Sequence, residues 1–185
     1  MKELLALMIC GLLASSALAA DFTIGERLQA APAPKVAGVR QLKWEDLIPG
    51  DWKPEKLFKD LNLDQLKDGD PRAVEALAKM RAAWDAAPAV TALNGQRVKL
   101  SGFMVMLDSN RRGVTEFLLV PYFGACIHIP APPSNQIVHV FPDMPVPDKI
   151  AMAPVWVTGL LQASSANTSM GSASYRIEAA LVEAY

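Results

Sequence analysis

The sequence predicts a mainly β protein with some α-helix: a five-stranded OB-like Greek-key barrel preceded by a helical N-terminal segment. Two observations lead to this prediction. Residues 71–86 follow the i, i+3, i+4 spacing of a helix, whereas from residue 90 onward the apolar residues follow the period of two that is typical of strands. The first predicted strand is also long and contains Gly102, where a strand of a small barrel can bend or bulge.

The first 19 residues have the pattern of a cleavable export signal. Lys2 precedes an apolar run over residues 4–13, and residues 17–19 (Ala-Leu-Ala) supply the small side chains that signal peptidase requires. Two serines end the apolar run well short of the roughly 20 residues that span a bilayer. Cys10 lies inside the run rather than after it, which argues against a lipoprotein signal. We therefore expect cleavage near Ala19 and an exported protein with no membrane span.

The charge balance of the remaining chain excludes some classes of partner. The full chain has 18 basic and 19 acidic residues, and removal of the signal takes away Lys2 and Glu3, which leaves 17 basic and 18 acidic residues and a net charge of −1. This balance provides no positive surface for nucleic acid or for an anionic membrane. The length suits one globular domain that comprises residues 40–88 and 89–185.

The segment before the strands is expected to be helical. Residues 20–39 are rich in Ala, Pro and Gly and predict a flexible leader. Residues 40–88 follow, with a short helical turn around Trp44 that packs on the main domain, and a second short helix over residues 54–66.

The clearest helix of the chain is predicted over residues 71–86. Asp70 is a suitable N-cap, and Pro71 fits the first helical position, where a missing N–H costs nothing. We expect the apolar face of this helix, which includes Val74, Leu77 and Trp84, to pack on the barrel.

Residues 89–185 contain the predicted barrel. Asn94-Gly95 is a hairpin signal that precedes the first strand. The expected strands cover residues 96–107, 115–120, 136–141, 154–162 and 173–183. A Ser/Ala/Gly-rich hairpin loop over residues 164–172 joins the last two.

Residues 116–141 hold the residues with most chemical potential. His128 and His139 are the only histidines of the chain, and Cys126 is the only cysteine outside the predicted signal. The mature chain thus has one thiol in an oxidising compartment and no cysteine to pair with it. Such a thiol is buried, bound to something or reactive.

A metal site is one interpretation of this cluster. On an extended backbone Cys126 and His128 point to the same face, and His139 lies on the returning strand. One thiolate and two imidazoles provide three of the four ligands of a tetrahedral zinc site, with water or a carboxylate such as Glu116 as the fourth. Copper is the alternative, because thiolates and nearby methionine thioethers are soft donors. Asn135 and Gln136 would then support the ligands or cap the proline-rich turn.

Two other interpretations remain open. Cys126 can be a packed core residue in a non-catalytic interaction module, whose loop over residues 122–136 docks a partner protein. Alternatively, Cys126 is the nucleophile of a thiol-dependent enzyme with His128 as its base, although residues two apart on a strand lie side by side.

The motif PYFGACIHIPAPPSNQIVHV resembles the signature of DUF3299, a bacterial family of exported proteins of unknown function. The resemblance extends to WEDLIP at residues 44–49 and LNGQRVKLSGFMV at residues 93–105, and its matched polar positions are Cys126, His128, Asn135 and Gln136. It implies a periplasmic protein that works beside a membrane transporter component linked to zinc supply. The combined expectation is an accessory metal-binding protein with Cys126, His128 and His139 as ligands.

Overall fold

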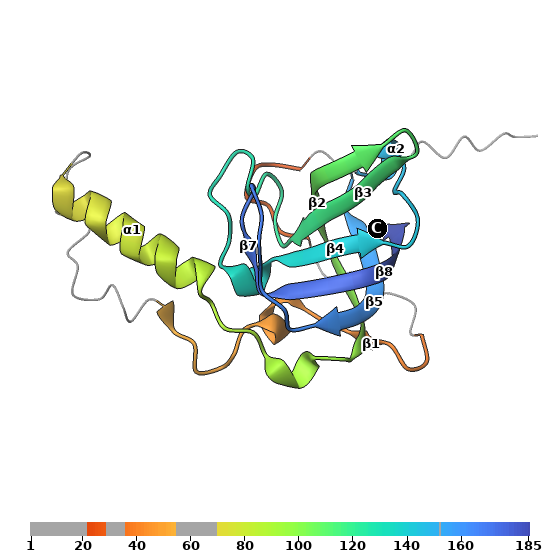
Figure 1. Ribbon diagram of the computed structural model, residues 1–185, viewed down its shortest axis with the longest axis horizontal. Helices are drawn as coiled ribbons and strands as arrows, with labels where there is room; N and C mark the ends of the chain where they lie inside the picture. The colour runs from red at the N-terminus through yellow and green to blue at the C-terminus, as the bar shows by residue number, and fades with distance from the viewer. Residues whose placement is uncertain (1–21, 29–35, 55–69, 152) are drawn as a thin grey trace, which may run out of the picture.

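A computed structural model of the chain describes residues 22–28, 36–54, 70–151 and 153–185 (Figure 1). The predicted export signal, and the predicted helix at 54–66 apart from its first residue, lie outside these ranges. No helix within the described ranges is both long enough and apolar enough to cross a membrane.

The described chain is mainly β, as predicted, and its centre is a six-stranded sheet in the order β1-β2-β3-β4-β8-β5. The strands are β1 (Arg40–Gln41), β2 (Arg97–Asn110), β3 (Gly113–Val120), β4 (Val138–Pro142), β5 (Val155–Gln162) and β8 (Tyr175–Ala184). Strand β2 also pairs with β5, the last strand of this order, so the five strands from β2 to β5 form a ring of hydrogen-bonded pairs. The five expected strands are present, and the sheet gains β1, which pairs parallel to β2.

The remaining short elements lie between the long strands. The expected loop at 164–172 overlaps a small hairpin of β6 (Ala166–Asn167) and β7 (Ser172–Ala173). A one-turn helix, α2 (Asp148–Ala151), follows β4.

Gly102 marks the point where β2 changes its neighbour. Residues Arg97 to Gly102 pair with β5, and Phe103 onward pairs with β3. A Cβ atom at Gly102 would lie 2.6 Å from the Val120 carbonyl oxygen and 2.9 Å from Leu119 Cγ. The glycine is therefore required by the close approach of β3, which accounts for its place in the middle of a long strand.

Two apolar clusters cover opposite sides of the strands. Because side chains alternate along a strand, Phe117 and Leu119 of β3 join the larger cluster and Leu118 joins the smaller one. The larger cluster also takes in Trp44 and Leu47 from the 3-10 helix η1 (Trp44–Leu47), so the predicted helical turn does pack on the main domain.

Tyr175 ties the N-terminal segment to the sheet. Its ring is fully buried at the start of β8. The Tyr175 hydroxyl donates to the Leu47 carbonyl oxygen at 2.8 Å and accepts from the Val90 N–H at 2.6 Å. One side chain thereby joins three segments that are far apart in the sequence.

Helix α1 (Pro71–Asp85) has nearly the predicted length but not the predicted packing. The Asp70 side chain accepts a hydrogen bond from the Arg72 N–H at 2.9 Å, which confirms the N-cap. However, α1 projects from one side of the sheet instead of lying on it (Figure 1). Val74 and Leu77, expected to pack on the strands, are 60% and 59% exposed.

The hairpin prediction at Asn94-Gly95 is wrong. The 3-10 helix η4 (Thr91–Leu93) precedes the turn, so no strand enters it. Asn94 has φ −60° and only Gly95 has a positive φ, of 77°, whereas a type I′ hairpin turn needs positive φ at both positions. The turn leads from η4 into β2, and the Asn94 side chain accepts a hydrogen bond from the Ala163 N–H at 2.9 Å.

Residues 22–28, within the predicted leader, lie against the loop that follows β3. The Gly25 N–H donates to the Phe123 carbonyl oxygen at 2.8 Å, and the Phe123 N–H donates to Glu26 at 2.9 Å. Phe22 packs edge-to-face on Phe103, with ring centroids 5.0 Å apart. Residues 22–28 therefore contact the smaller apolar cluster.

Candidate functional site

His139 is buried in β4 and bonded to a carboxylate. Its Nε2 lies 2.7 Å from Oε1 of Glu116 on β3, and its ring packs on Phe141 at a centroid distance of 4.4 Å. Its Nδ1 is buried and has no hydrogen-bond partner among the described residues. The structure thus pairs two of the predicted site residues, but as a histidine–carboxylate pair with one ring nitrogen unsatisfied.

Cys126 and His128 do not share the face of an extended strand. They lie in a turn in which the amide groups of residues 127, 128 and 129 all point to the Gly124 carbonyl oxygen, with the His128 N–H at 2.9 Å. Cys126 itself has a left-handed φ of 64°. The turn directs the Cys126 side chain into the smaller apolar cluster and leaves His128 exposed.

Partial burial raises the pKa of the Cys126 thiol. Desolvation by the surrounding apolar side chains raises its pKa from 9.0 to about 11, since it disfavours the thiolate. At pH 7 only about one molecule in ten thousand would carry the thiolate that acts as a nucleophile or soft metal ligand. Within the described chain no hydrogen bond joins this thiol to either histidine.

The structure does not gather the predicted zinc or copper ligands into one group. Cys126 packs against the apolar cluster, His128 faces outward and His139 is engaged with Glu116. Among the described residues, which include all three, no group of three or more His, Cys, Asp and Glu side chains could hold a metal ion. The prediction that Cys126 and His128 point to the same face was wrong, because it assumed an extended strand where the chain makes a turn.

Asn135 and Gln136 hold the N-terminal segment instead of supporting a ligand. The 3-10 helix η5 (Ser134–Gln136) is entirely buried. The Gln136 side-chain amide donates to the Trp44 carbonyl oxygen at 2.8 Å, and the Asn135 amide donates to the Pro88 carbonyl oxygen at 3.2 Å. Neither bond caps the proline-rich turn, because both partners lie in distant segments.

The proline-rich loop and α1 enclose an apolar groove, which we call the α1 groove. Its volume is about 440 Å³. The lining residues are Leu77, Met80, Arg81, Trp84 and Asp85 of α1 with Tyr122, Ile129, Pro130, Ala131 and Pro132 of the loop. The groove therefore combines aromatic faces, proline rings and flexible apolar side chains, with one charge of each sign on α1.

Comparison with known proteins supports the resemblance seen in the motif. The family model described as "Protein of unknown function (DUF3299)" matches residues 44–184. The chain belongs to the DUF3299 family. A crystal structure of a DUF3299 family protein from Pseudomonas aeruginosa PAO1 is similar, with 37% sequence identity and a TM-score of 0.61, and the match covers 80% of this chain and 96% of that one. A search of curated proteins found no match.

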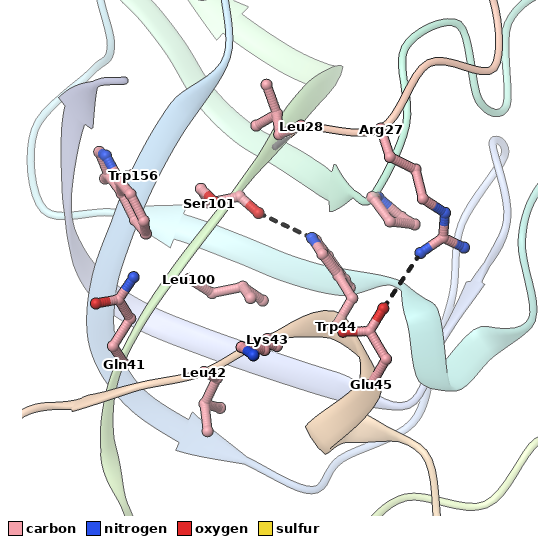
Figure 2. A pocket seen from close by; sticks show the side chains of 11 residues that line it. Arg27, Leu28, Gln41, Leu42, Lys43, Trp44, Glu45, Leu100, Ser101 and Trp156 are labelled. Atoms are coloured by element: carbon pink, nitrogen blue, oxygen red, sulfur yellow. Dashed lines mark hydrogen bonds and ion pairs between the residues drawn. The ribbon is translucent and has the colours of Figure 1, made fainter. Parts of the chain in front are cut away.

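The DUF3299 match includes every residue that lines the α1 groove. It does not include Arg27 and Leu28, which lie before residue 44 and help to enclose a second, larger cavity (Figure 2). The sequence did not predict this cavity, although the turn around Trp44 was expected to pack on the main domain. No local sequence pattern points to this cavity, because its lining comes from segments far apart in the chain.

Proposed function

We propose that this DUF3299 chain is an exported, non-catalytic binding module whose α1 groove holds an apolar segment of a partner protein. The observation that carries the proposal is the open apolar face of α1. Leu77 lines the groove and is 59% exposed, and Val74, one turn nearer the N-terminus of α1, is 60% exposed. The apolar surface thus continues beyond the groove, which suits a polypeptide better than a small molecule.

The chemistry of the groove favours an extended segment with bulky apolar side chains. Trp84 and Tyr122 offer flat faces, and Met80 can adapt its shape to an occupant. Arg81 and Asp85 are both exposed and stand one helical turn apart. They can form hydrogen bonds with the backbone of a bound segment. Because their charges are opposite, they favour neither an acidic nor a basic segment.

A displayed library of random peptides, selected against the mature protein, tests this proposal. We expect enrichment of peptides with large apolar side chains, and an affinity at least tenfold lower for Leu77→Glu when fluorescence anisotropy is measured on a selected peptide. Leu181→Glu is the matched control, because Leu181 is 57% exposed on β8. Binding that Leu77→Glu leaves unchanged, or that both variants weaken equally, would refute the proposal.

The competing predictions concern the thiol and are separated by its reactivity. Zinc or copper binding, a transporter component as partner, and thiol catalysis stay predictions from the sequence. For a binding module we expect Cys126 to resist iodoacetamide at pH 7 in the folded protein, with or without a chelator. Stoichiometric alkylation at neutral pH would favour the enzyme, and alkylation only after chelation would favour the metal site.

We also propose that the strands form an OB-like barrel and that residues 1–19 direct the chain to the periplasm. The ring of pairings β2-β3-β4-β8-β5, in which only β4 and β8 run parallel, supports the barrel. Cell fractionation followed by N-terminal sequencing tests the export, with a mature end near residue 20 as the expected result.

A further inference from the structure

A second concave site lies between the N-terminal segments and the sheet (Figure 2). Its volume is about 650 Å³, which is within the range of roughly 300–1,000 Å³ that is usual for small-molecule sites. The walls come from Arg27 and Leu28, residues 41–45, Leu100 and Ser101 of β2, Pro121, and Trp156 of β5. It shares no lining residue with the α1 groove.

Two indole rings form rigid walls of this cavity. The Trp44 Nε1–H donates to the Ser101 carbonyl oxygen at 2.8 Å (Figure 2). The Trp156 ring is stacked on Tyr185 at a centroid distance of 5.3 Å and is contacted by the Lys99 ammonium at the same distance. Both tryptophans are more than nine-tenths buried, so their conformations are fixed before a ligand arrives.

The charged side chains at the cavity favour an anion. Two cations, Arg27 and Lys43, and one carboxylate, Glu45, line it. Arg27 and Glu45 are 3.7 Å apart, as the dashed line in Figure 2 marks, and both are more than half exposed, so this ion pair is weak and can open. Lys43 forms no ion pair within the described ranges, which leaves the lining with one excess positive charge.

We propose that this cavity binds a planar aromatic molecule that carries one anionic group. The ring would lie in the cavity against Leu100, Pro121 and the parts of Trp44 and Trp156 that line it, and the carboxylate or sulfonate would meet Lys43 and Arg27 at the rim. A rigid apolar lining that includes aromatic residues, with cations at its edge, favours such a ligand over a cationic one. Arg27, Leu28 and residues 41–43 of this lining lie before the residues that the family model matches.

The test uses 2-naphthoate and its cationic counterpart 2-naphthylmethylamine with the mature protein. In isothermal titration calorimetry we expect one saturable site for 2-naphthoate and at least tenfold weaker binding of the amine. Higher salt should weaken the binding of the anion, because the charges at the rim are exposed. Equal binding of the two probes, or no saturable binding of 2-naphthoate, overturns the proposal.

Three variants locate the binding. Lys43→Glu should reduce the affinity for 2-naphthoate at least tenfold, whereas Lys149→Glu, at an exposed lysine of α2, should leave it unchanged. Glu45→Gln should raise the affinity about threefold, because it frees Arg27 for the ligand. These side chains are exposed, so the variants should fold, which their unfolding temperatures will verify. Equal effects of the two lysine variants, or no increase for Glu45→Gln, would contradict the assignment.

Discussion

At the scale of single residues, the environment of Cys126 decides its chemistry. The residue type and its proximity to His128 in the sequence are compatible with a nucleophile, a metal ligand or a core residue. A left-handed turn puts the thiol among apolar side chains and raises its pKa to about 11. The same turn exposes the imidazole next to it.

The raised pKa predicts a contribution of Cys126 to the pH dependence of stability. A group whose pKa is higher in the folded state stabilises the fold below its unfolded pKa, and the stabilisation is lost as the pH rises. We therefore expect the free energy of unfolding to fall more steeply between pH 9 and pH 11 in the wild type than in Cys126→Ala. Urea denaturation at several pH values measures this difference. Parallel curves would show that the thiol titrates alike in both states.

Tyr175 provides a second prediction at this scale. Tyr175→Phe removes the hydroxyl that bonds both to Leu47 and to Val90, so two backbone groups lose their partner. We expect a loss of about 2 kcal/mol in the free energy of unfolding. Tyr122→Phe is the control, since the Tyr122 hydroxyl forms no hydrogen bond within the described ranges. Similar losses in the two variants would mean that the bonds of Tyr175 are not responsible.

At the scale of elements, β2 organises the sheet because it serves two neighbours in turn. Its first half pairs with β5 and its second half pairs with β3. The pairing of β2 with β3 also shifts register after Met106. A strand with this double role needs a residue without a side chain where the neighbours change, and Gly102 occupies that place.

Gly102→Ala tests the role of this close approach. The added methyl group would meet the Val120 carbonyl oxygen at 2.6 Å, so β3 has to shift. We expect destabilisation by about 2–3 kcal/mol, measured by urea denaturation. Gly50→Ala is the matched control, because no atom lies within 4 Å of its added Cβ and its φ is not left-handed. A neutral Gly102→Ala would show that the strands tolerate the shift.

At the scale of the whole molecule, the segment before the strands completes the domain. Trp44 and Leu47 fill the larger apolar cluster, and three polar side chains, Tyr175, Gln136 and Asn135, bond its backbone or that of residues 88–90. Residues 22–28 add one wall of the cavity in Figure 2. Both stretches therefore line the cavity, and residues 44–47 also fill the larger apolar cluster.

Two truncated chains separate these contributions. A chain that starts at Val36 keeps Trp44 and Leu47 but lacks Arg27 and Leu28, so we expect it to unfold cooperatively and to lose its affinity for 2-naphthoate. A chain that starts at Pro49 lacks both core residues. Each large core side chain contributes about 3–5 kcal/mol, so we expect no cooperative transition in circular dichroism. A stable fold for the shorter chain would contradict the packing described above.

Much of the fold was predictable from local patterns. The alternation of apolar residues predicted five strands that are present, and Asp70-Pro71 predicted the start of α1. The packing of α1 and the turn at Asn94-Gly95 were not predicted correctly, because amphipathic spacing does not say what covers a face and an Asn-Gly pair suits more than one turn. Of the candidate site, only the proximity of Glu116 and His139 agrees with the expected clustering.

The sequence by itself determined the mainly β class, the family and the residues available for chemistry. These follow from local spacing and from the rarity of Cys and His, which need no knowledge of distant contacts. Only the tertiary structure decided what those residues do, because burial, register and left-handed turns depend on segments far away in the chain. It packed Cys126 against an apolar cluster, used Asn135 and Gln136 to hold Pro88 and Trp44, and brought Arg27 and Trp156 to one cavity.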